Sequence, residues 1–487
     1  MPCTTILVGK KASNDGSTMI SRTDDGFFDT KKTIVVEPKK QPKIYKSVIG
    51  NQEIELPDQP LRYTCSPSVN PRHGIWPAAG NNELNVGMTA TETISNNERV
   101  YGADPLINVS WEAIGTKRKK NVPGGIGEED IVTLVLPYIH SAREGVLRLG
   151  SLLEKYGTYE SNGIAFNDEN EVWWLETIGG HHWIARRVKD EEYVIMPNQW
   201  GLDRFDLDDA FGEQKENLCS ADLKEFIEKY HLNTNNHGEF NPRKIFGTHS
   251  DLDHIYNTPR AWYIGRYFNR DSYKWEGENA DFTPQSDNIP WAMVPDFKIS
   301  IEDVKYILST TYQGTEYYAY GNSPKRGIYR PIGIARTGIT TIQHIRPDMP
   351  EPLKGLEWIT YGANPFNVAL PFYTNVDKLP KYISETPEDI DTSYFYWQSR
   401  LIGALSDPIH STMIQDIERY QKKVAGKARE IINNYDQKMI ETQDYSLMKK
   451  ANEEICQMVN KESKAILAKA LAESSRNMRC NYNRADN

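Results

Sequence analysis

The fold is decided by residues 3–25 of the chain, CTTILVGKKASNDGSTMISRTDD. Residues 4–8 and 18–22 are rich in β-branched and apolar side chains, which is typical of buried strands. Between them, residues 13–17 read Ser-Asn-Asp-Gly-Ser, a strong signal for a turn that joins two antiparallel strands. These residues predict a β-hairpin at the start of the chain.

The predicted hairpin brings three chemically active side chains close together. Folding the chain back at residues 13–17 places Cys3 at the open end, opposite residues 27–28. Asp25 then lies roughly 7–10 Å along the strand from the level of Cys3, and Arg22 lies on the returning strand. A thiol, a guanidinium and a carboxylate therefore converge within a few residues of the N-terminus.

These three side chains could together form an activated nucleophile. If residues 1 and 2 are removed, Cys3 carries a thiol and a free α-amine, whose ordinary pKa of about 7.7–8.0 suits it to accept the thiol proton. Arg22 would favour the thiolate by its opposite charge, and Asp25 could orient the amine or the thiol. The competing interpretation is that Cys3 is a small buried hydrophobe and that Arg22 and Asp25 form a surface ion pair.

The same residues resemble a known family. Residues 3–13, followed by Asp-Gly-Ser-Thr at 15–18 and Arg22-Thr-Asp-Asp25, resemble the start of the C69 dipeptidases, a family of N-terminal nucleophile (Ntn) hydrolases. The Arg-x-x-Asp spacing is also similar to that of the wider group with penicillin V acylase and bile salt hydrolase. Further stretches that resemble the family are residues 87–93, 162–176 and 361–373. The resemblance implies a four-layer αββα sandwich.

The resemblance also implies an activity and a set of site residues. It implies a cysteine-type peptidase that hydrolyses dipeptides through an acyl-enzyme on Cys3, with no cofactor and no metal. By chain order, Asn198 matches a residue that helps to form the oxyanion hole, and Arg336 matches a further arginine that supports the site. The alternatives are that Asn198 closes a turn after a strand and that Arg336 is an ordinary surface arginine.

Two other functions stay open at this point. One is an amidase that acts on non-peptide acyl amides, as in the penicillin and bile salt relatives, although the length and the C-terminal helices favour the dipeptidase branch. The other is a non-catalytic binding protein that resembles the secernins, against which the intact set of Cys3, Arg22 and Asp25 argues. One departure from the family pattern concerns the nucleophile itself: Pro2 precedes Cys3, so exposure of the α-amine requires cleavage of the Pro2–Cys3 bond.

The composition of the chain limits the kinds of partner that we expect it to bind. The chain has 487 residues, a net charge of -10 and no long basic run, which argues against nucleic acid as a partner. No apolar run is long enough to span a membrane and the N-terminus lacks the pattern of a signal peptide, so we expect a cytoplasmic protein. The small peptide as substrate is what the resemblance implies. The sequence leaves open whether it forms a homo-oligomer.

Neither a disulfide framework nor a metal site is expected. The five cysteines are widely scattered and form no Cys-x-x-Cys pair, which is typical of a reducing compartment. Residues 249–254 read His-Ser-Asp-Leu-Asp-His, but the two histidines do not share one helix face and no further ligand is near. A polar loop or the start of a helix is the favoured interpretation of that stretch.

The remaining pattern predicts an α+β chain with long C-terminal helices. Residues 128–156 have helical periodicity that Pro137 should divide, and residues 163–196 form four short strands that we interpret as an antiparallel meander. From residue 409 to about 475 the apolar residues recur at helical spacing. We therefore expect a catalytic domain over residues 3–408, with residues 409–475 as a helical segment packed on it.

Overall fold

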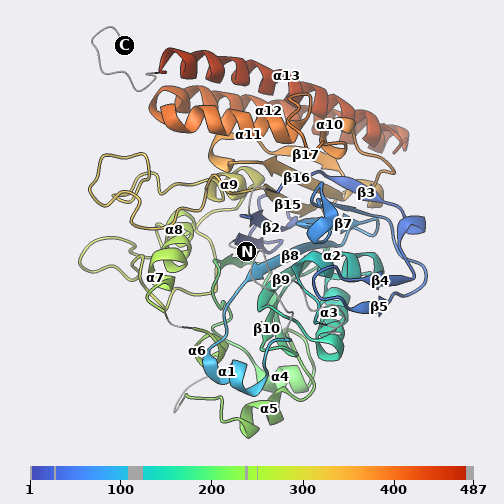
Figure 1. Cartoon of the computed structure of the whole chain (residues 1–487), viewed down its shortest axis with the longest axis vertical. Coiled ribbons are helices and arrows are strands. Elements are labelled where there is room, and N and C mark those ends of the chain that lie inside the picture. Colours follow the sequence, from blue (N-terminus) through green and yellow to red (C-terminus); the bar gives the residue numbers. More distant parts are fainter. Residues whose placement is uncertain (1–2, 27–28, 108–123, 236–239, 249, 479–487) are drawn as a thin grey trace.

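The computed structural model describes residues 3–26, 29–107, 124–235, 240–248 and 250–478 of the chain. Met1 and Pro2, whose removal is expected, therefore lie outside this part, and so does His249 of the histidine-containing stretch. Figure 1 shows two sheets in the middle of the molecule, with helices on both sides and a long pair of C-terminal helices along one side.

The first sheet contains the N-terminal hairpin at its centre and is antiparallel throughout. Its seven strands are, in spatial order, β14 (Ala292–Met293), β12 (Tyr193–Met196), β1 (Cys3–Val8), β2 (Thr18–Asp24), β15 (Ile339–Ile345), β16 (Gly355–Tyr361) and β17 (Leu370–Tyr373). The hairpin strands are buried along their whole length, as their apolar and β-branched sequence predicted.

The second sheet is also antiparallel and is built from the segment between residues 34 and 219. Its eight strands are, in spatial order, β13 (Asn217–Cys219), β11 (His182–Val188), β10 (Val172–Ile178), β9 (Asn162–Asn167), β8 (Gly87–Thr93), β7 (Ala79–Asn82), β6 (Tyr63–Cys65) and β3 (Ile34–Val36). A separate two-stranded ribbon consists of β4 (Ile44–Lys46) and β5 (Glu53–Glu55).

The two sheets pack face to face, with β1, β2 and β15 against β8. Successive residues of a strand point to opposite faces, and the hairpin follows this rule. Leu7 and Ile20 contribute to the apolar cluster inside the sandwich, together with Trp174 of β10. Ile6 and Val8 point the other way, into the cluster beneath the helices.

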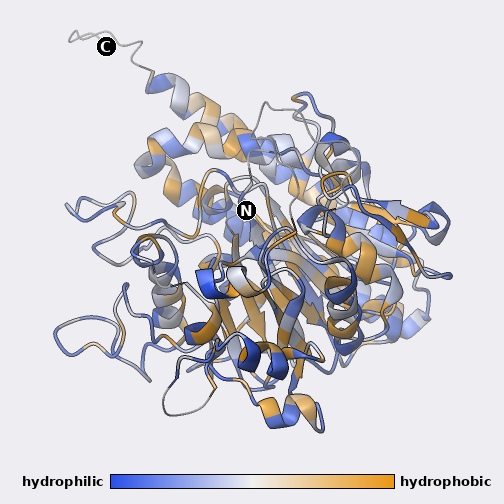
Figure 2. Ribbon diagram, turned by 60° about the horizontal axis from the view of Figure 1, so that its bottom comes forward, coloured by the Kyte–Doolittle hydropathy of each residue, from blue (hydrophilic) through white to orange (hydrophobic). Residues whose placement is uncertain are grey.

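Helices cover both outer faces. The α-helices among the described residues are α1 (Glu98–Ala103), α2 (Glu128–Val135), α3 (Ala142–Tyr156), α4 (Leu207–Phe211), α5 (Leu223–Lys229), α6 (Pro242–Phe246), α7 (Asp253–Tyr256), α8 (Thr258–Phe268), α9 (Ile301–Ile307), α10 (Lys381–Ser384), α11 (Phe395–Ser406), α12 (His410–Thr442) and α13 (Leu447–Arg476). Helices α2 and α3 contact the second sheet, whereas α8, α11 and α13 contact the first. In Figure 2 apolar colours dominate the strands inside these helical layers. The predicted αββα order of layers, with long C-terminal helices, is confirmed.

The structure corrects two details of the prediction. Cys3 pairs with Asp24 rather than with residues 27–28, because the connection from Gly9 to Ser17 is a long loop with its own bonds and not a tight turn centred on Asp15. The four strands of residues 163–196 are not one meander either. Strand β12 leaves the second sheet and pairs with β1, which carries its end to Cys3.

The long helices are amphipathic and pack on the first sheet. Residues of α12 and α13 at helical spacing, among them Met413, Ile417, Ile455 and Val459, belong to the same apolar cluster as Ile6 and Val8. In the part of the chain that the structure describes, no helix is both long and apolar enough to cross a bilayer.

The carboxyl group of Glu357 allows a test of how strongly the space between the two sheets excludes water. It lies on β16, is completely buried, and accepts a hydrogen bond of 3.2 Å from Thr64 of the second sheet. Burial raises the pKa of its carboxyl group to about 7. A raised carboxyl pKa means that the folded chain binds the proton more tightly, so stability is full below the unfolded pKa and is lost as pH rises.

We therefore expect the free energy of unfolding of the natural chain to fall, relative to that of Glu357→Gln, by roughly 3 kcal/mol between about pH 4.5 and pH 7. Denaturant unfolding at a series of pH values measures this difference. The exposed Glu430→Gln on α12 is the control and should show no such trend. A constant difference between the natural chain and Glu357→Gln would contradict the assignment.

Candidate active site

Cys3 begins β1 and its thiol lies inside the sandwich, completely buried. Arg22 of β2 pairs with Thr5, so it projects from the same face as Cys3. Its Nη2 atom donates to Cys3 Sγ at 3.1 Å and also to Glu128 Oε1, while Nη1 donates to the carbonyl oxygen of Ala78 at 3.1 Å. The predicted meeting of Cys3 and Arg22 is thus a direct contact.

The surroundings of the thiol pull its pKa in two directions. Burial has the largest effect and raises the pKa of Cys3 well above its ordinary value, and the nearby carboxylates Glu92 and Glu128 raise it further. The Arg22 guanidinium lowers it. A thiol in this setting is held in its protonated form and needs a base close by before it can act as a nucleophile.

Asn198 holds the nitrogen of Cys3. It follows β12, which lies beside β1, and its Oδ1 atom accepts hydrogen bonds from Cys3 N at 3.0 Å and from Arg260 at 2.9 Å. Its Nδ2 atom donates to the carbonyl oxygen of Thr93 at 3.1 Å. The structure thus brings Asn198 to Cys3 as the sequence suggested, but through its amide oxygen; the expected oxyanion role would require the second hydrogen of Nδ2.

Arg260 is a site residue that the sequence analysis did not identify. It lies in the first turn of α8, completely buried, and donates to the carbonyl oxygen of Cys3, to Thr4 Oγ1 at 2.8 Å and to Asn257 Oδ1 at 2.7 Å. Burial lowers the pKa of its guanidinium to about 10. No sequence pattern marked Arg260, because the burial of this part of α8 is seen only in the structure.

Asp25 supports the hairpin from its other face. It is completely buried and accepts hydrogen bonds from Thr337 Oγ1 at 2.7 Å, from Thr23 Oγ1 at 3.3 Å and from Arg330. Thr23 Oγ1 in turn accepts a bond of 2.9 Å from the backbone nitrogen of Thr4. Asp25 thus reaches the neighbourhood of Cys3 through Thr23 and Thr4.

Arg336 contacts a tyrosine of α7. Its Nη2 atom donates to the hydroxyl of Tyr256 at 3.0 Å. The guanidinium groups of Arg330 and Arg260 lie over the ring of the same tyrosine, at 5.1 Å and 5.3 Å from its centroid. Arg336 is therefore connected to the site through Tyr256, whereas Arg330 forms the ion pair with Asp25.

The stretch with two histidines is held by ordinary polar contacts. Asp253 accepts from Asn257 Nδ2 at 2.5 Å and from Ser250 Oγ at 2.9 Å, and His254 is paired with Asp287 at 2.9 Å. Among the described residues no group of three or more His, Cys, Asp or Glu side chains could hold a metal ion. The four cysteines in the described part, Cys3, Cys65, Cys219 and Cys456, are free thiols.

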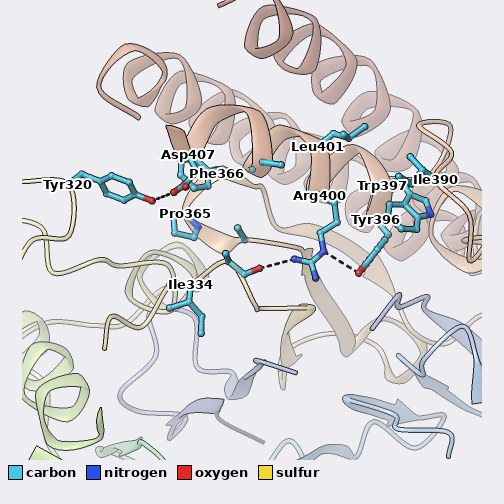
Figure 3. Close-up of a pocket in the computed structure, with 15 residues that line it drawn as sticks. Tyr320, Ile334, Pro365, Phe366, Ile390, Tyr396, Trp397, Arg400, Leu401 and Asp407 are labelled. Atoms are coloured by element: carbon cyan, nitrogen blue, oxygen red, sulfur yellow. Dashed lines mark hydrogen bonds between the residues drawn. The ribbon is translucent and has the colours of Figure 1, made fainter. Parts of the chain in front are cut away.

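A cavity of about 440 Å³ lies behind the loop that carries the partners of Asp25 (Figure 3). Gly333, Ile334 and Ala335 form one wall, between Arg330 and Thr337 in the sequence, and α11 forms another. Arg400 of α11 donates to the carbonyl oxygen of Ala335 at 2.8 Å and so ties this loop to the helix. The residues that line the cavity do not include Cys3.

The chain is similar to known peptidases along most of its length. The family model described as peptidase family C69 matches residues 2–423. A dipeptidase of Bifidobacterium longum is 52% identical over 90% of this chain and 83% of its own length. Dipeptidase A of Lactobacillus helveticus is 42% identical over 99% of both chains. Among solved structures, a mutant conjugated bile acid hydrolase from Clostridium perfringens matches 77% of this chain and 92% of its own, with 12% identity and a TM-score of 0.32.

The buried hairpin with Cys3 at its start thus belongs to a peptidase. The extent of the family match and the identity to these relatives establish that the chain belongs to peptidase family C69. The resemblance inferred from residues 3–25 is confirmed.

The Arg330–Asp25 pair gives a test of how the hairpin is supported. Both side chains are almost fully buried, so removal of one charge leaves the other uncompensated. We expect Arg330→Met to lower the free energy of unfolding by about 3–5 kcal/mol, and Asp25→Asn in the same chain to restore part of it, with a coupling energy of about 1–3 kcal/mol.

Denaturant unfolding of both single variants and the double variant measures the coupling. The exposed pair of Lys381 and Glu385 is the matched control, and it should couple by less than about 1 kcal/mol. Additive effects at Arg330 and Asp25 would mean that the pair does not act as a unit.

Proposed function

We propose that this chain is a cysteine-type peptidase that hydrolyses dipeptides, with Cys3 as an N-terminal nucleophile. The observation that carries the proposal is that Cys3 is held at both of its reactive atoms, Sγ by Arg22 at 3.1 Å and N by Asn198 at 3.0 Å. The relatives named dipeptidases, at 42–52% identity, support the choice of substrate.

The first step is attack on the peptide carbonyl. Once Cys3 is the first residue, its α-amine accepts the thiol proton and the thiolate bonds to the carbonyl carbon. Arg22 stabilises the thiolate by its charge. The carbonyl oxygen becomes an oxyanion, for which the Nδ2 group of Asn198 and backbone amides are the proposed donors.

The second step releases the products. The ammonium of Cys3 returns its proton to the leaving nitrogen, the carbon–nitrogen bond breaks, and a thioester remains on Cys3. Water, with the amine again as base, attacks the thioester and frees the acid and the thiol. Arg260 and Asn198 fix the orientation of Cys3, while Asp25 with Arg330, and Arg336 through Tyr256, are positioning residues.

The amine becomes available only when Met1 and Pro2 have been removed. Attack of the Cys3 thiol on the carbonyl carbon of Pro2, followed by hydrolysis of the resulting thioester, would release these two residues and leave the amine on Cys3. The nucleophile that the proposal uses for substrates would then also process its own chain. We propose a catalytic domain of residues 3–408 with residues 409–475 packed on it.

Replacement of the thiol tests the nucleophile. We expect Cys3→Ala to lose hydrolysis of every dipeptide that the natural chain cleaves, because no other group can form the acyl-enzyme. The control is Cys219→Ala, which removes a thiol from β13 and should keep full activity. Hydrolysis by Cys3→Ala at the natural rate would refute the mechanism.

Replacement of Arg260 tests the orientation of Cys3. A lysine cannot reach Cys3 O, Thr4 and Asn198 together, so we expect Arg260→Lys to lower kcat/KM by about 100-fold or more. The matched control is Arg346→Lys, which breaks a largely buried pair with Asp436 remote from Cys3. It should lower the melting temperature but change kcat/KM less than about threefold. Equal losses in both variants would mean that Arg260 acts only on stability.

A further inference from the structure

A buried carboxylate lies beside the thiol and has no role in the mechanism above. Glu128 begins α2 on the outer face of the second sheet, and its Oε1 atom accepts a hydrogen bond from Arg22 Nη2. The same nitrogen donates to Cys3 Sγ. Because both hydrogen bonds share the Nη2 atom of Arg22, the carboxylate oxygen lies within about 6 Å of the sulfur.

Two further buried carboxyl groups, those of Glu160 and Glu92, lie around this pair. Glu160 accepts a hydrogen bond of 2.7 Å from the backbone nitrogen of Glu128, and burial together with Glu128 raises the pKa of Glu160 to about 7. Glu92 is 1% exposed and lies on β8, next to the strand face that carries Cys3 and Thr5. Burial raises the pKa of Glu92 to about 8.

Glu92 also has an unused oxygen. Its Oε2 atom accepts from Thr5 Oγ1 at 2.8 Å, but Oε1 is buried and has no hydrogen-bond partner among the residues that the structure describes. A buried carboxylate oxygen without a partner is costly, and a cationic donor that enters the site with a substrate would remove that cost. The surroundings of Cys3 therefore contain an acceptor for a positive charge.

A dipeptide carries such a charge at the required distance. Its α-ammonium nitrogen is two bonds from the scissile carbonyl carbon, which is about 2.5 Å. When the sulfur approaches that carbon at about 3–3.5 Å, the ammonium lies about 5–6 Å from the sulfur at most. The ammonium nitrogen and the carboxylate oxygen of Glu128 thus fall within the same range of distances from the sulfur.

We propose that Glu128, with Glu160 and Glu92 around it, binds the free α-ammonium of the substrate and makes the enzyme specific for peptides that are cleaved after their first residue. The inference rests on the proposed function and adds the recognition element to it. Acyl groups of the penicillin or bile salt type carry no ammonium, so they would offer no cationic donor to the unpartnered oxygen of Glu92.

The test compares each dipeptide with its N-acetyl derivative, which has the same scissile bond but no charge. The kcat/KM values for Ala-Ala and N-acetyl-Ala-Ala are measured on the processed natural chain and on Glu128→Gln, Glu160→Gln and the exposed control Glu144→Gln on α3. We expect the natural chain and the control to prefer the free dipeptide. Glu128→Gln should reduce this preference by about 10- to 100-fold, and Glu160→Gln should reduce it less.

The ratio separates recognition from damage to the nucleophile, because a disturbed Arg22 or Cys3 would slow both substrates alike. An unchanged ratio in both glutamine variants would overturn the inference and leave the dipeptidase proposal intact. Loss of all activity on both substrates in both variants would also overturn it, since it would assign the carboxylates to the support of Arg22. Failure of the natural chain to cleave any dipeptide would instead refute the proposed function.

Discussion

The site depends on one buried guanidinium. Arg22 stands between the thiol of Cys3 and the carboxylate of Glu128, and its other nitrogen binds the backbone of Ala78 in the loop before β7. A buried charge of this kind is tolerated only where its partners are held in place by the surrounding fold. The hairpin supplies the thiol, the second sheet and its helix supply the acceptors, and the packing of the two sheets keeps water from the group.

The layers around Arg22 explain why distant parts of the chain meet at Cys3. Strand β12 lies beside β1 and delivers Asn198, α8 lies beneath the first sheet and delivers Arg260, and the segment before β15 delivers Arg330 to Asp25. Each of these groups touches the backbone or a neighbour of Cys3 rather than its sulfur. They therefore fix the orientation of Cys3, the proposed nucleophile, which a short buried strand cannot fix alone.

The local part of this arrangement could be predicted from the sequence. The hairpin, the approach of Arg22 to Cys3 and the division of the helix at Pro137 follow from patterns within about 30 residues, and the structure has all three. Arg260 could not be found in this way, because its role comes from a packing contact across more than 250 residues of chain. The register of Cys3 was also missed, since the bonds of the loop from Gly9 to Ser17 moved the pairing to Asp24. Asn198 was identified through the family resemblance, by its place at the end of a strand, but the contact of its amide oxygen with Cys3 N was not expected.

The central claim is that Cys3 acts with its own α-amine as the base, and the intact mass of the active protein tests it most directly. Mass spectrometry of the purified chain, fractionated and assayed for dipeptide hydrolysis, gives the N-terminus of each active species. The account predicts that activity follows the fraction of chains that have lost Met1 and Pro2 and begin at Cys3. Full activity in chains that retain Pro2 would contradict it, because the nitrogen of Cys3 would then be an amide that cannot accept a proton.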